Sequence, residues 1–268
     1  MNEYSQLIKH PDISLSPISD GIGVGNPATG EILAYVRNTG SDKLKNLIQK
    51  AAAAQKLWAA KTALERADIL WRWYFLVKEN KEALARLMTM EQGKSLTEAR
   101  GEIDYAASFV RWFAEEARRI DGDVLTSVKA SQKLVVLKQP VGVTAAITPW
   151  NFPSAMIARK AAPALAVGCA MIVKPASLTP LSAYALAVLA YEAGVPQDLL
   201  PVVSGRASEI SHEFATNPTV RKISFTGSTE VGAKIFAGSA ADIKKLSLEL
   251  GGNAPFIVFD DADLDKAV

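Results

Sequence analysis

From residue 141 onward, short apolar segments alternate with segments of helical pattern. The apolar segments are VGVTAAI, AMIVKP, LLPVVS, VRKISF, KKLSLEL and APFIVF. Helices are predicted between them, beginning near Pro153, from Leu181, near Ser208 and after Gly227. This alternation predicts an α/β fold, a doubly wound parallel sheet with helices on both faces, in which ligands bind at the carboxyl ends of the strands.

The first part of the chain predicts a series of helices. Residues 41–60 open with Ser41, a good N-cap residue, followed by an acid, and are rich in alanine and leucine. Thr62 with Glu65, and Ser95 with Glu98, have the spacing of capping boxes and predict two further helix starts. A glycine at position 93 is expected to end the helix between them.

The segment from Ser95 to Ile120 carries one apolar stripe at steps of three and four residues, which predicts a single helix with one buried face. The stripe consists of Ile103, Ala106, Ala107, Val110, Phe113 and Ala114. Trp71, Trp73 and Trp112 are interpreted as core aromatic residues rather than as binding residues.

After residue 122 the pattern becomes rich in β-branched residues and is interrupted by Pro140, which predicts an extended ribbon leading into a new strand. The expected organisation is therefore an N-terminal helical part (residues 1–122), a ribbon (123–140), an α/β part (141–252) and the start of a further domain (253–268).

Composition excludes several classes of protein. A formal net charge of +2 over 268 residues gives no reason to expect nucleic acid or an anionic membrane as a partner. The N-terminus lacks a secretory signal pattern and no segment has the apolar length of a membrane span, so a cytoplasmic location is expected. Cys169 is the only cysteine, and His10 and His212 are the only histidines, so neither a disulfide nor a His/Cys metal cluster is expected.

Three loops after predicted strands carry candidate binding groups. The loop 147–153 places the Asn151 amide at the edge of the sheet, and Lys174 follows the next strand. The loop FTGSTEVG opens a helix at Ser228, directly after Gly227, where backbone N–H groups can receive an anion. The alternatives are a turn residue at 151, a solvated strand end at 174 and simple loop geometry at 227. The loop is also not the GxGxxG fingerprint, so spacing alone does not identify a dinucleotide site.

Taken together, PWNFP, VKPA, FTGSTEVG and LELGG, in this order and at these separations, resemble the NAD(P)-dependent aldehyde dehydrogenase superfamily. The amino-acid sequence from about residue 25 onward is most similar to those of bacterial succinate-semialdehyde dehydrogenases. The resemblance implies a Rossmann-like cofactor domain, a small-molecule aldehyde as substrate, and oxidation of that aldehyde to its acid with NAD or NADP.

The resemblance also assigns roles to individual residues. It implies that Glu249 of LELGG is the general base and that Asn151 donates a hydrogen bond to the oxyanion. Because Glu249 adjoins an apolar strand, desolvation is expected to make its carboxylate a better base. Relatives line their cofactor site at positions that match Thr148, Pro149, Trp150, Lys174, Ser177, Gly227, Ser228 and Leu250.

Two side chains bear on specificity. Relatives that prefer NAD often have a glutamate where this chain has Ser177, and a carboxylate there would repel the 2′-phosphate of NADP. We therefore expect NADP to be used at least as well as NAD. Arg159 matches an arginine that holds the far carboxylate of succinate semialdehyde in relatives, with a surface arginine as the alternative.

The nucleophilic cysteine of the family lies in a later motif, which residues 1–268 do not contain. Cys169 is expected to be buried in apolar surroundings and inert. This chain is therefore expected to be catalytically inactive, to lack most of the catalytic domain, and to associate through its ribbon and exposed strand edges into a homo-oligomer. The competing interpretation is a non-catalytic nucleotide-binding or interaction protein.

Overall fold

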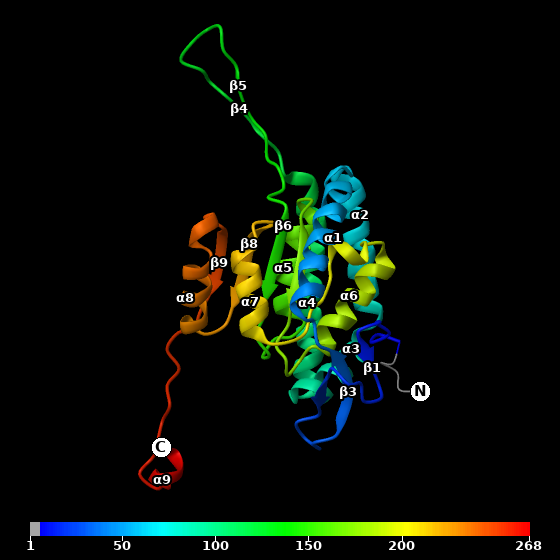
Figure 1. The fold of residues 1–268 in the computed structure, drawn as a ribbon, viewed down its shortest axis with the longest axis vertical. Coiled ribbons are helices and arrows are strands. Elements are labelled where there is room, and N and C mark those ends of the chain that lie inside the picture. Colours follow the sequence, from blue (N-terminus) through cyan, green and yellow to red (C-terminus); the bar gives the residue numbers. More distant parts are fainter. Residues whose placement is uncertain (1–5) are drawn as a thin grey trace.

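The computed structural model describes residues 6–268, and its centre is a four-stranded parallel sheet (Figure 1). The strand order is β7-β6-β8-β9, and every neighbouring pair is parallel. The strands are β6 Val143–Ile147, β7 Ala170–Lys174, β8 Val220–Thr226 and β9 Lys245–Glu249. All four were predicted from their apolar segments, and the α/β fold class is confirmed.

The helices between these strands also lie where the sequence predicts them. They are α5 Ala155–Ala166, α6 Leu181–Ala193, α7 Ala207–Thr216 and α8 Thr229–Gly238, with short 3-10 turns at Gln197–Leu199 (η2) and Ala240–Asp242 (η3). The segment LLPVVS, predicted as a strand, is reduced to one parallel bridge between Val202 and Val173. Pro201 lies in this segment and has no N–H, which limits the pairing the segment can make.

If the segment at Val202 is counted as a strand, the sheet order is Val202-β7-β6-β8-β9. Numbered along the chain, these strands lie in the order 3-2-1-4-5, as in a dinucleotide-binding sheet. The order reverses between β6 and β8. Right-handed crossovers then place α5 and α6 on one face and α7 and α8 on the other. The loops after β6 and β8 therefore border the crevice where a doubly wound sheet binds its ligand.

Within residues 6–268, four helices precede the sheet: α1 Ser41–Ala59, α2 Ala63–Glu79, α3 Lys81–Gln92 and α4 Leu96–Glu116, the last continued by the 3-10 turn η1 Ala117–Arg119. Both predicted capping boxes are present, at Thr62 with Glu65 and at Ser95 with Glu98. Gly93 ends α3 in the left-handed region with φ 92°, as expected. The Ser41 prediction was wrong in detail, because Gly40 is the N-cap and Ser41 is already helical.

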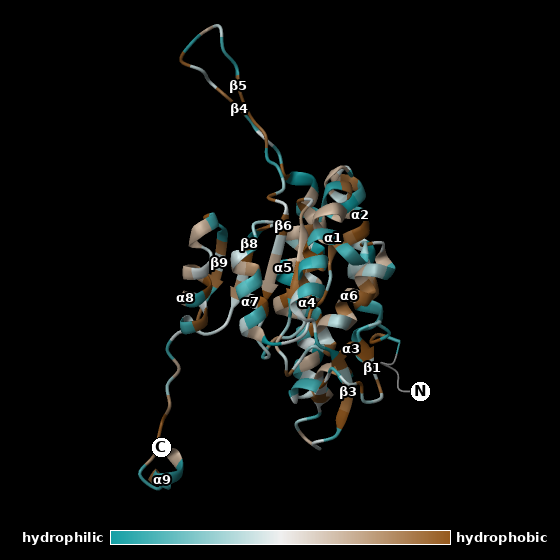
Figure 2. Cartoon of the chain, viewed as in Figure 1, coloured by the Kyte–Doolittle hydropathy of each residue, from teal (hydrophilic) through white to brown (hydrophobic). Residues whose placement is uncertain are grey.

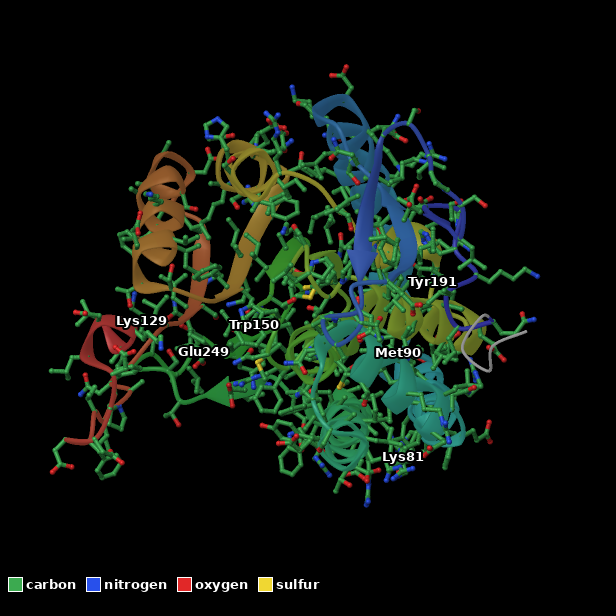
Figure 3. All side chains as sticks on the ribbon, turned by 90° about the horizontal axis from the view of Figure 1, so that it is seen from below. Lys81, Met90, Lys129, Trp150, Tyr191 and Glu249 are labelled. Atoms are coloured by element: carbon green, nitrogen blue, oxygen red, sulfur yellow. The ribbon has the colours of Figure 1, made fainter. Side chains whose placement is uncertain are left out.

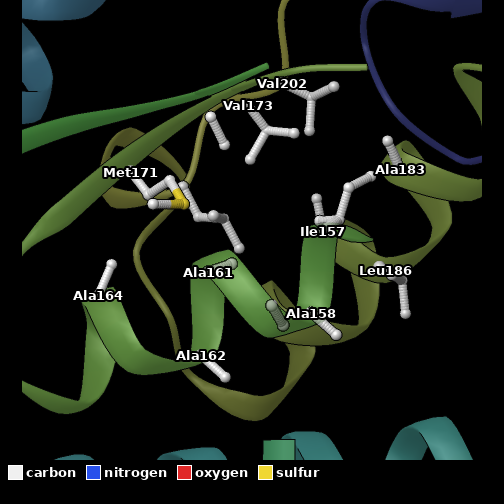
Figure 4. Close-up of a cluster of buried hydrophobic side chains, with 14 of the residues drawn as sticks. Ile157, Ala158, Ala161, Ala162, Ala164, Met171, Val173, Ala183, Leu186 and Val202 are labelled. Atoms are coloured by element: carbon white, nitrogen blue, oxygen red, sulfur yellow. The ribbon is translucent and has the colours of Figure 1, made fainter. Parts of the chain in front are cut away.

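The core is continuous from these helices to the sheet. The α5 helix packs against β6, β7 and α4, while α1 packs against β6 and β7. Figure 4 shows α5 lying against β7, with the buried side chains of Ala161 and Ile157 on the helix and of Met171 and Val173 on the strand. The small alanines of α5 allow this close approach, so the residues that follow β6 are held on a rigid support.

The three tryptophans interpreted as core residues differ in environment. Trp73 is fully buried and donates its Nε1–H to the carbonyl of Leu186 on α6 at 3.1 Å. Trp71 is half-buried and stacks on Phe75. The prediction for Trp112 was wrong, because its side chain is 58% exposed on α4. Its position between the buried residues Val110 and Ala114 places it just outside the apolar stripe.

A small antiparallel sheet precedes the helices and was not predicted. It consists of β1 Ile13–Ser14, β2 Gly21–Gly25 and β3 Ile32–Arg37, in the order β1-β3-β2. Glycines occupy alternate positions of β2, which weakens the strand pattern in the sequence.

The predicted ribbon forms, and it projects from the body (Figure 1). It pairs β4 Asp123–Leu125 with β5 Leu134–Val136 in antiparallel register. Its apolar residues, among them Val124, Val135 and Leu137, are exposed, and Figure 2 shows hydrophobic positions along both of its strands.

The segment after β9 extends away from the sheet and ends in α9 Leu264–Ala267 (Figure 1). The prediction of a strand at APFIVF was wrong, because residues 254–259 are exposed and make no ladder with any described residue. Apolar side chains favour a strand only where a neighbouring strand pairs with it. Among residues 6–268, no helix is long and apolar enough to cross a membrane.

Candidate active site

The loop after β6 lies at the reversal point of the sheet. Thr148 is buried and donates its N–H to the carbonyl of Lys174, at the end of the neighbouring strand, at 3.1 Å. Pro149 is half-buried, Trp150 is 54% exposed and Asn151 is exposed. The Asn151 side chain is therefore free to meet a ligand at this edge, as the sequence predicts.

A buried network holds the backbone of this loop. Glu102 of α4 is 3% exposed and accepts hydrogen bonds from the N–H groups of Ser154 and Ala155, at the start of α5, at 2.9 and 3.1 Å. Lys94 pairs with Glu102 at 2.5 Å and donates to the Asn151 carbonyl at 2.8 Å. Sequence reasoning missed Lys94 and Glu102, because they lie about fifty residues before the loop and no local motif links them to it.

Lys174 ends β7 and is 4% exposed, so the alternative of a solvated strand end was wrong. Its Nζ lies 3.5 Å from the Oγ of the exposed Ser177. Burial lowers the pKa of Lys174, and no carboxylate pairs with it among the described residues. A buried ammonium without a protein counter-ion is well suited to bind an anionic or hydroxyl-rich ligand.

The N-terminus of α8 is open. Ser228 is its N-cap, with Oγ accepting from the Val231 N–H at 3.3 Å, and Gly227 donates its N–H to the carbonyl of Glu249 on the next strand at 3.1 Å. Leu250 is 41% exposed beside this helix, in contact range of Gly232. The predicted helix start at Ser228 is confirmed.

Two of the other helix starts at this edge, those of α5 and α6, are already occupied by protein carboxylates. Glu102 caps α5, and Glu91 of α3 accepts from the Leu181 N–H, and at 3.0 and 2.7 Å from the Ser182 N–H and Oγ–H, at the start of α6. The positive ends of α5 and α6 are thus satisfied internally, whereas that of α8 is available to an external anion.

Burial raises the pKa of Glu91 to about 7, against hydrogen bonds from Ser182 and Leu181 that lower it. The folded state therefore keeps the Glu91 proton to a higher pH than the unfolded chain, which loses it near its ordinary value of 4.5. The stability that this proton contributes is fully present below about pH 4.5 and is lost as the pH rises through about 7.

Relative to a Glu91→Gln variant, the wild-type free energy of unfolding is expected to fall by roughly 3 kcal/mol between these two pH values. Urea unfolding at a series of pH values measures this difference. A Glu192→Gln variant, which removes an exposed carboxylate of α6, is the control and should follow the wild type. Parallel pH curves for wild type and Glu91→Gln would contradict the assignment.

A cavity of about 750 Å³ opens on the sheet face that bears α5. It brings together Arg159 of α5 and Glu249 of β9, ninety residues apart in the chain, with 4.0 Å between the guanidinium Nη2 and the carboxylate Oε1. Arg159 also lies over the ring of Phe109, 5.7 Å from its centroid. Arg159 is therefore a half-buried residue of the cavity wall, and its role toward a substrate stays a prediction.

The environment expected for Glu249 differs from the one observed. Its side chain is 61% exposed, so the desolvation predicted from the adjoining apolar strand was wrong for this structure. The strand alternates exposed and half-buried residues, and Glu249 falls on the exposed side. Trp150 on the loop after β6 and Glu249 at the end of β9 are both labelled in Figure 3.

Two of the predicted cofactor residues, Trp150 and Ser177, line a second and smaller cavity of about 280 Å³, together with residues of β2 and with Glu91.

Two buried hydroxyls lie at the carboxyl edge of the sheet without a partner. The Oγ1 atoms of Thr148, directly after β6, and of Thr226, at the end of β8, have no hydrogen-bond partner within the described chain. Unsatisfied hydroxyls at the reversal point of the sheet are consistent with a site that a polar ligand completes.

Cys169 is 1% exposed, and burial raises the pKa of its thiol. The expected burial of Cys169 is confirmed. A buried thiol with a raised pKa is a poor nucleophile, so its lack of reactivity stays a prediction.

Residues 16–268 match the aldehyde dehydrogenase family. The chain belongs to that family. It is 60% identical over 247 residues to a glutarate-semialdehyde dehydrogenase of Pseudomonas aeruginosa, covering 92% of this chain and 51% of that protein. It is 59% identical over 249 residues to the succinate-semialdehyde dehydrogenase [NADP(+)] GabD of Escherichia coli, covering 93% and 52%.

A solved structure of an E. coli NADP-dependent enzyme superposes on this aldehyde dehydrogenase chain with a TM-score of 0.86 and 60% sequence identity, covering 92% of this chain and 51% of that one. The chain thus spans about half the length of the relatives it matches. The family resemblance stated from PWNFP, VKPA, FTGSTEVG and LELGG is confirmed.

Proposed function

We propose that the protein acts in the NAD(P)-dependent oxidation of an aldehyde that carries a carboxylate at its far end, such as succinate or glutarate semialdehyde. The observation that carries this proposal is the position of Arg159, 4.0 Å from the Glu249 carboxylate and in the same cavity. The ion pair is partly exposed and therefore weak, so a substrate carboxylate can replace Glu249 as the partner of Arg159. The names of the two semialdehyde dehydrogenases cited above support the same class of substrate.

The proposed roles follow from where each side chain lies. The Asn151 amide donates to the oxyanion that forms when a nucleophile adds to the aldehyde, and the Lys94–Glu102 network holds its loop in place. Glu249 accepts a proton as general base, and its exposure gives it access to water. The nicotinamide, when bound, accepts the hydride from the aldehyde carbon.

The residues at the sheet edge fit a dinucleotide. Lys174 and Ser177 would hold the adenosine ribose and, in NADP, its 2′-phosphate. The open N-terminus of α8 at Gly227 and Ser228 would receive the pyrophosphate. Thr148, Pro149, Trp150 and Leu250 would complete the site. We propose that NADP is used at least as well as NAD, because position 177 carries no carboxylate. The E. coli relative is named as an NADP(+) enzyme, which supports this choice.

Within this proposal, residues 1–268 bind the dinucleotide but do not turn over substrate, because their only thiol, Cys169, is buried. The exposed ribbon formed by β4 and β5 would join copies of the protein into a homo-oligomer. A cytoplasmic location remains a prediction. A non-catalytic binding protein is less well supported, because dinucleotide binding alone has no use for the Arg159–Glu249 pair.

The test of the proposed function is Arg159→Ala in a catalytically active protein that contains residues 1–268. The KM for succinate semialdehyde is expected to rise roughly 10- to 100-fold, because a charge-assisted contact to the substrate carboxylate is lost. The KM for butanal, a neutral aldehyde of the same length, is expected to change less than about 3-fold. Equal losses for the two aldehydes would refute the assignment of Arg159.

A further inference from the structure

Lys160 has a buried amine on the wall of the large cavity. The proposed function uses Arg159 and Glu249 of this cavity but gives no role to Lys160. It follows Arg159 on α5, is 7% exposed, and donates from Nζ to the Ser224 Oγ of β8 at 2.9 Å. No carboxylate pairs with it within hydrogen-bonding distance among the described residues. The hydrogen bond to the Ser224 hydroxyl orients the amine, but a neutral hydroxyl stabilises the protonated form less than a carboxylate would.

The cavity is strongly cationic. Besides Lys160, its lining includes the cationic side chains of Lys61, Arg66, Lys138, Arg159 and Lys222, and among the described lining residues Glu249 is the one carboxylate. An anionic molecule that enters is therefore attracted to several positive charges at once. The volume of about 750 Å³ readily accommodates a molecule of four or five carbon atoms.

The same surroundings favour the neutral form of the amine. Burial, with help from the positive charges of Arg159 and Lys222 and against the negative charge of Glu249, lowers the pKa of Lys160 to about 8. An exposed lysine keeps its proton to a pKa of about 10.4. At pH 7 roughly a tenth of Lys160 is thus neutral and nucleophilic, while exposed lysines are almost entirely protonated.

We propose that Lys160 is a covalent capture site for aldehydes that carry an anionic group. The Nζ lone pair attacks the aldehyde carbon to give a carbinolamine, and loss of one water then leaves a C=N bond between Nζ and that carbon. The nitrogen gives up two hydrogens and the aldehyde its oxygen, so the step needs no oxidant and no dinucleotide. The anionic end of the captured molecule lies among Arg159, Lys222 and the other cations of the cavity.

Capture does not depend on the proposed oxidation, since it uses neither Asn151 nor the Lys174–Ser177 region. A captured aldehyde would occupy the space beside Arg159 and Glu249. Excess aldehyde would therefore compete with any other ligand of this cavity.

The test is reductive trapping of the 268-residue polypeptide without dinucleotide. Succinate semialdehyde and sodium cyanoborohydride are added at pH 7.5, and the modified lysines are identified by peptide mass mapping. We expect Lys160 to be modified roughly ten-fold or more faster than any exposed lysine, because far more of it is neutral at this pH. Its modification should increase with pH and level off above about pH 8.

Two variants and a second aldehyde complete the experiment. Lys160→Arg, which keeps the charge but not the nucleophile, should remove the fast modification, whereas Lys222→Arg, at another lysine of the same cavity, should retain it. Butanal should modify Lys160 at least roughly five-fold more slowly than succinate semialdehyde, since it lacks the charge that the cavity attracts. Modification spread evenly over exposed lysines, or equal rates with butanal, would overturn the proposal.

Discussion

Replacing Trp73 by alanine is expected to lower the free energy of unfolding by roughly 4 kcal/mol. Trp73 is fully buried between α2 and α6, and its Nε1–H satisfies the carbonyl of Leu186. The alanine variant leaves both a large cavity and a buried carbonyl without its partner. Urea unfolding monitored by far-ultraviolet circular dichroism measures the difference.

Trp112→Ala is the matched control, since it removes the same side chain from an exposed position of α4. Its free energy of unfolding is expected to lie within about 0.5 kcal/mol of the wild-type value. Similar losses for the two variants would show that Trp112 is a core residue and that the helical packing described above is wrong.

Ser177→Glu is expected to lower the ratio of NADP affinity to NAD affinity by roughly 50-fold. The new carboxylate would stand beside Lys174 and repel the 2′-phosphate of NADP, while it could accept hydrogen bonds from the ribose hydroxyls of NAD. Titration of both dinucleotides into the wild type and the variant measures the ratio. Because exposed charges are screened, the shift should shrink at high salt.

Ser177→Gln, which has the shape of glutamate without its charge, is the control for this experiment. It should change the ratio by less than about 5-fold, because the dominant effect is electrostatic repulsion. If Ser177→Glu and Ser177→Gln behave alike, position 177 does not contact the 2′-phosphate.

The fold could be predicted from the second half of the sequence because each buried parallel strand is a short apolar run. β6 and β7 are fully buried along their length, so their pattern is unambiguous. The segment around Val202 has the same composition but forms only a bridge, and residues 254–259 pair with no described strand. Apolar composition predicts where a strand can form, whereas its partners decide whether it does.

The prediction that Trp112 is a core residue was wrong because apolar character alone does not say which side of a helix is buried. Trp73 and Trp112 both lie in helices with apolar neighbours, and only the angular position of each around its helix separates them. The β1–β3 sheet escaped prediction because its glycine-rich β2 lacks the side chains on which strand recognition depends.

The candidate site was predictable where its residues lie in local motifs. Lys174, Ser228 and the loop at Asn151 lie at the sheet edge, as the order of strands and loops implies. The Arg159–Glu249 pairing and the Lys94–Glu102 network are long-range contacts, which no single segment encodes. Exposure of Glu249 likewise depends on which residues cover β9, and the local sequence does not specify them.

We propose that residues 1–268 hold a dinucleotide site at the carboxyl edge of the parallel sheet. The most direct measurement is a calorimetric titration of NADP into the 268-residue polypeptide. We predict saturable binding at one site per chain, weakened by Lys174→Met, with no NADPH formed when succinate semialdehyde is then added. A wild-type chain that takes up no NADP at millimolar concentration, or a Lys174→Met chain that binds it equally well, would show that this edge of the sheet is not a dinucleotide site.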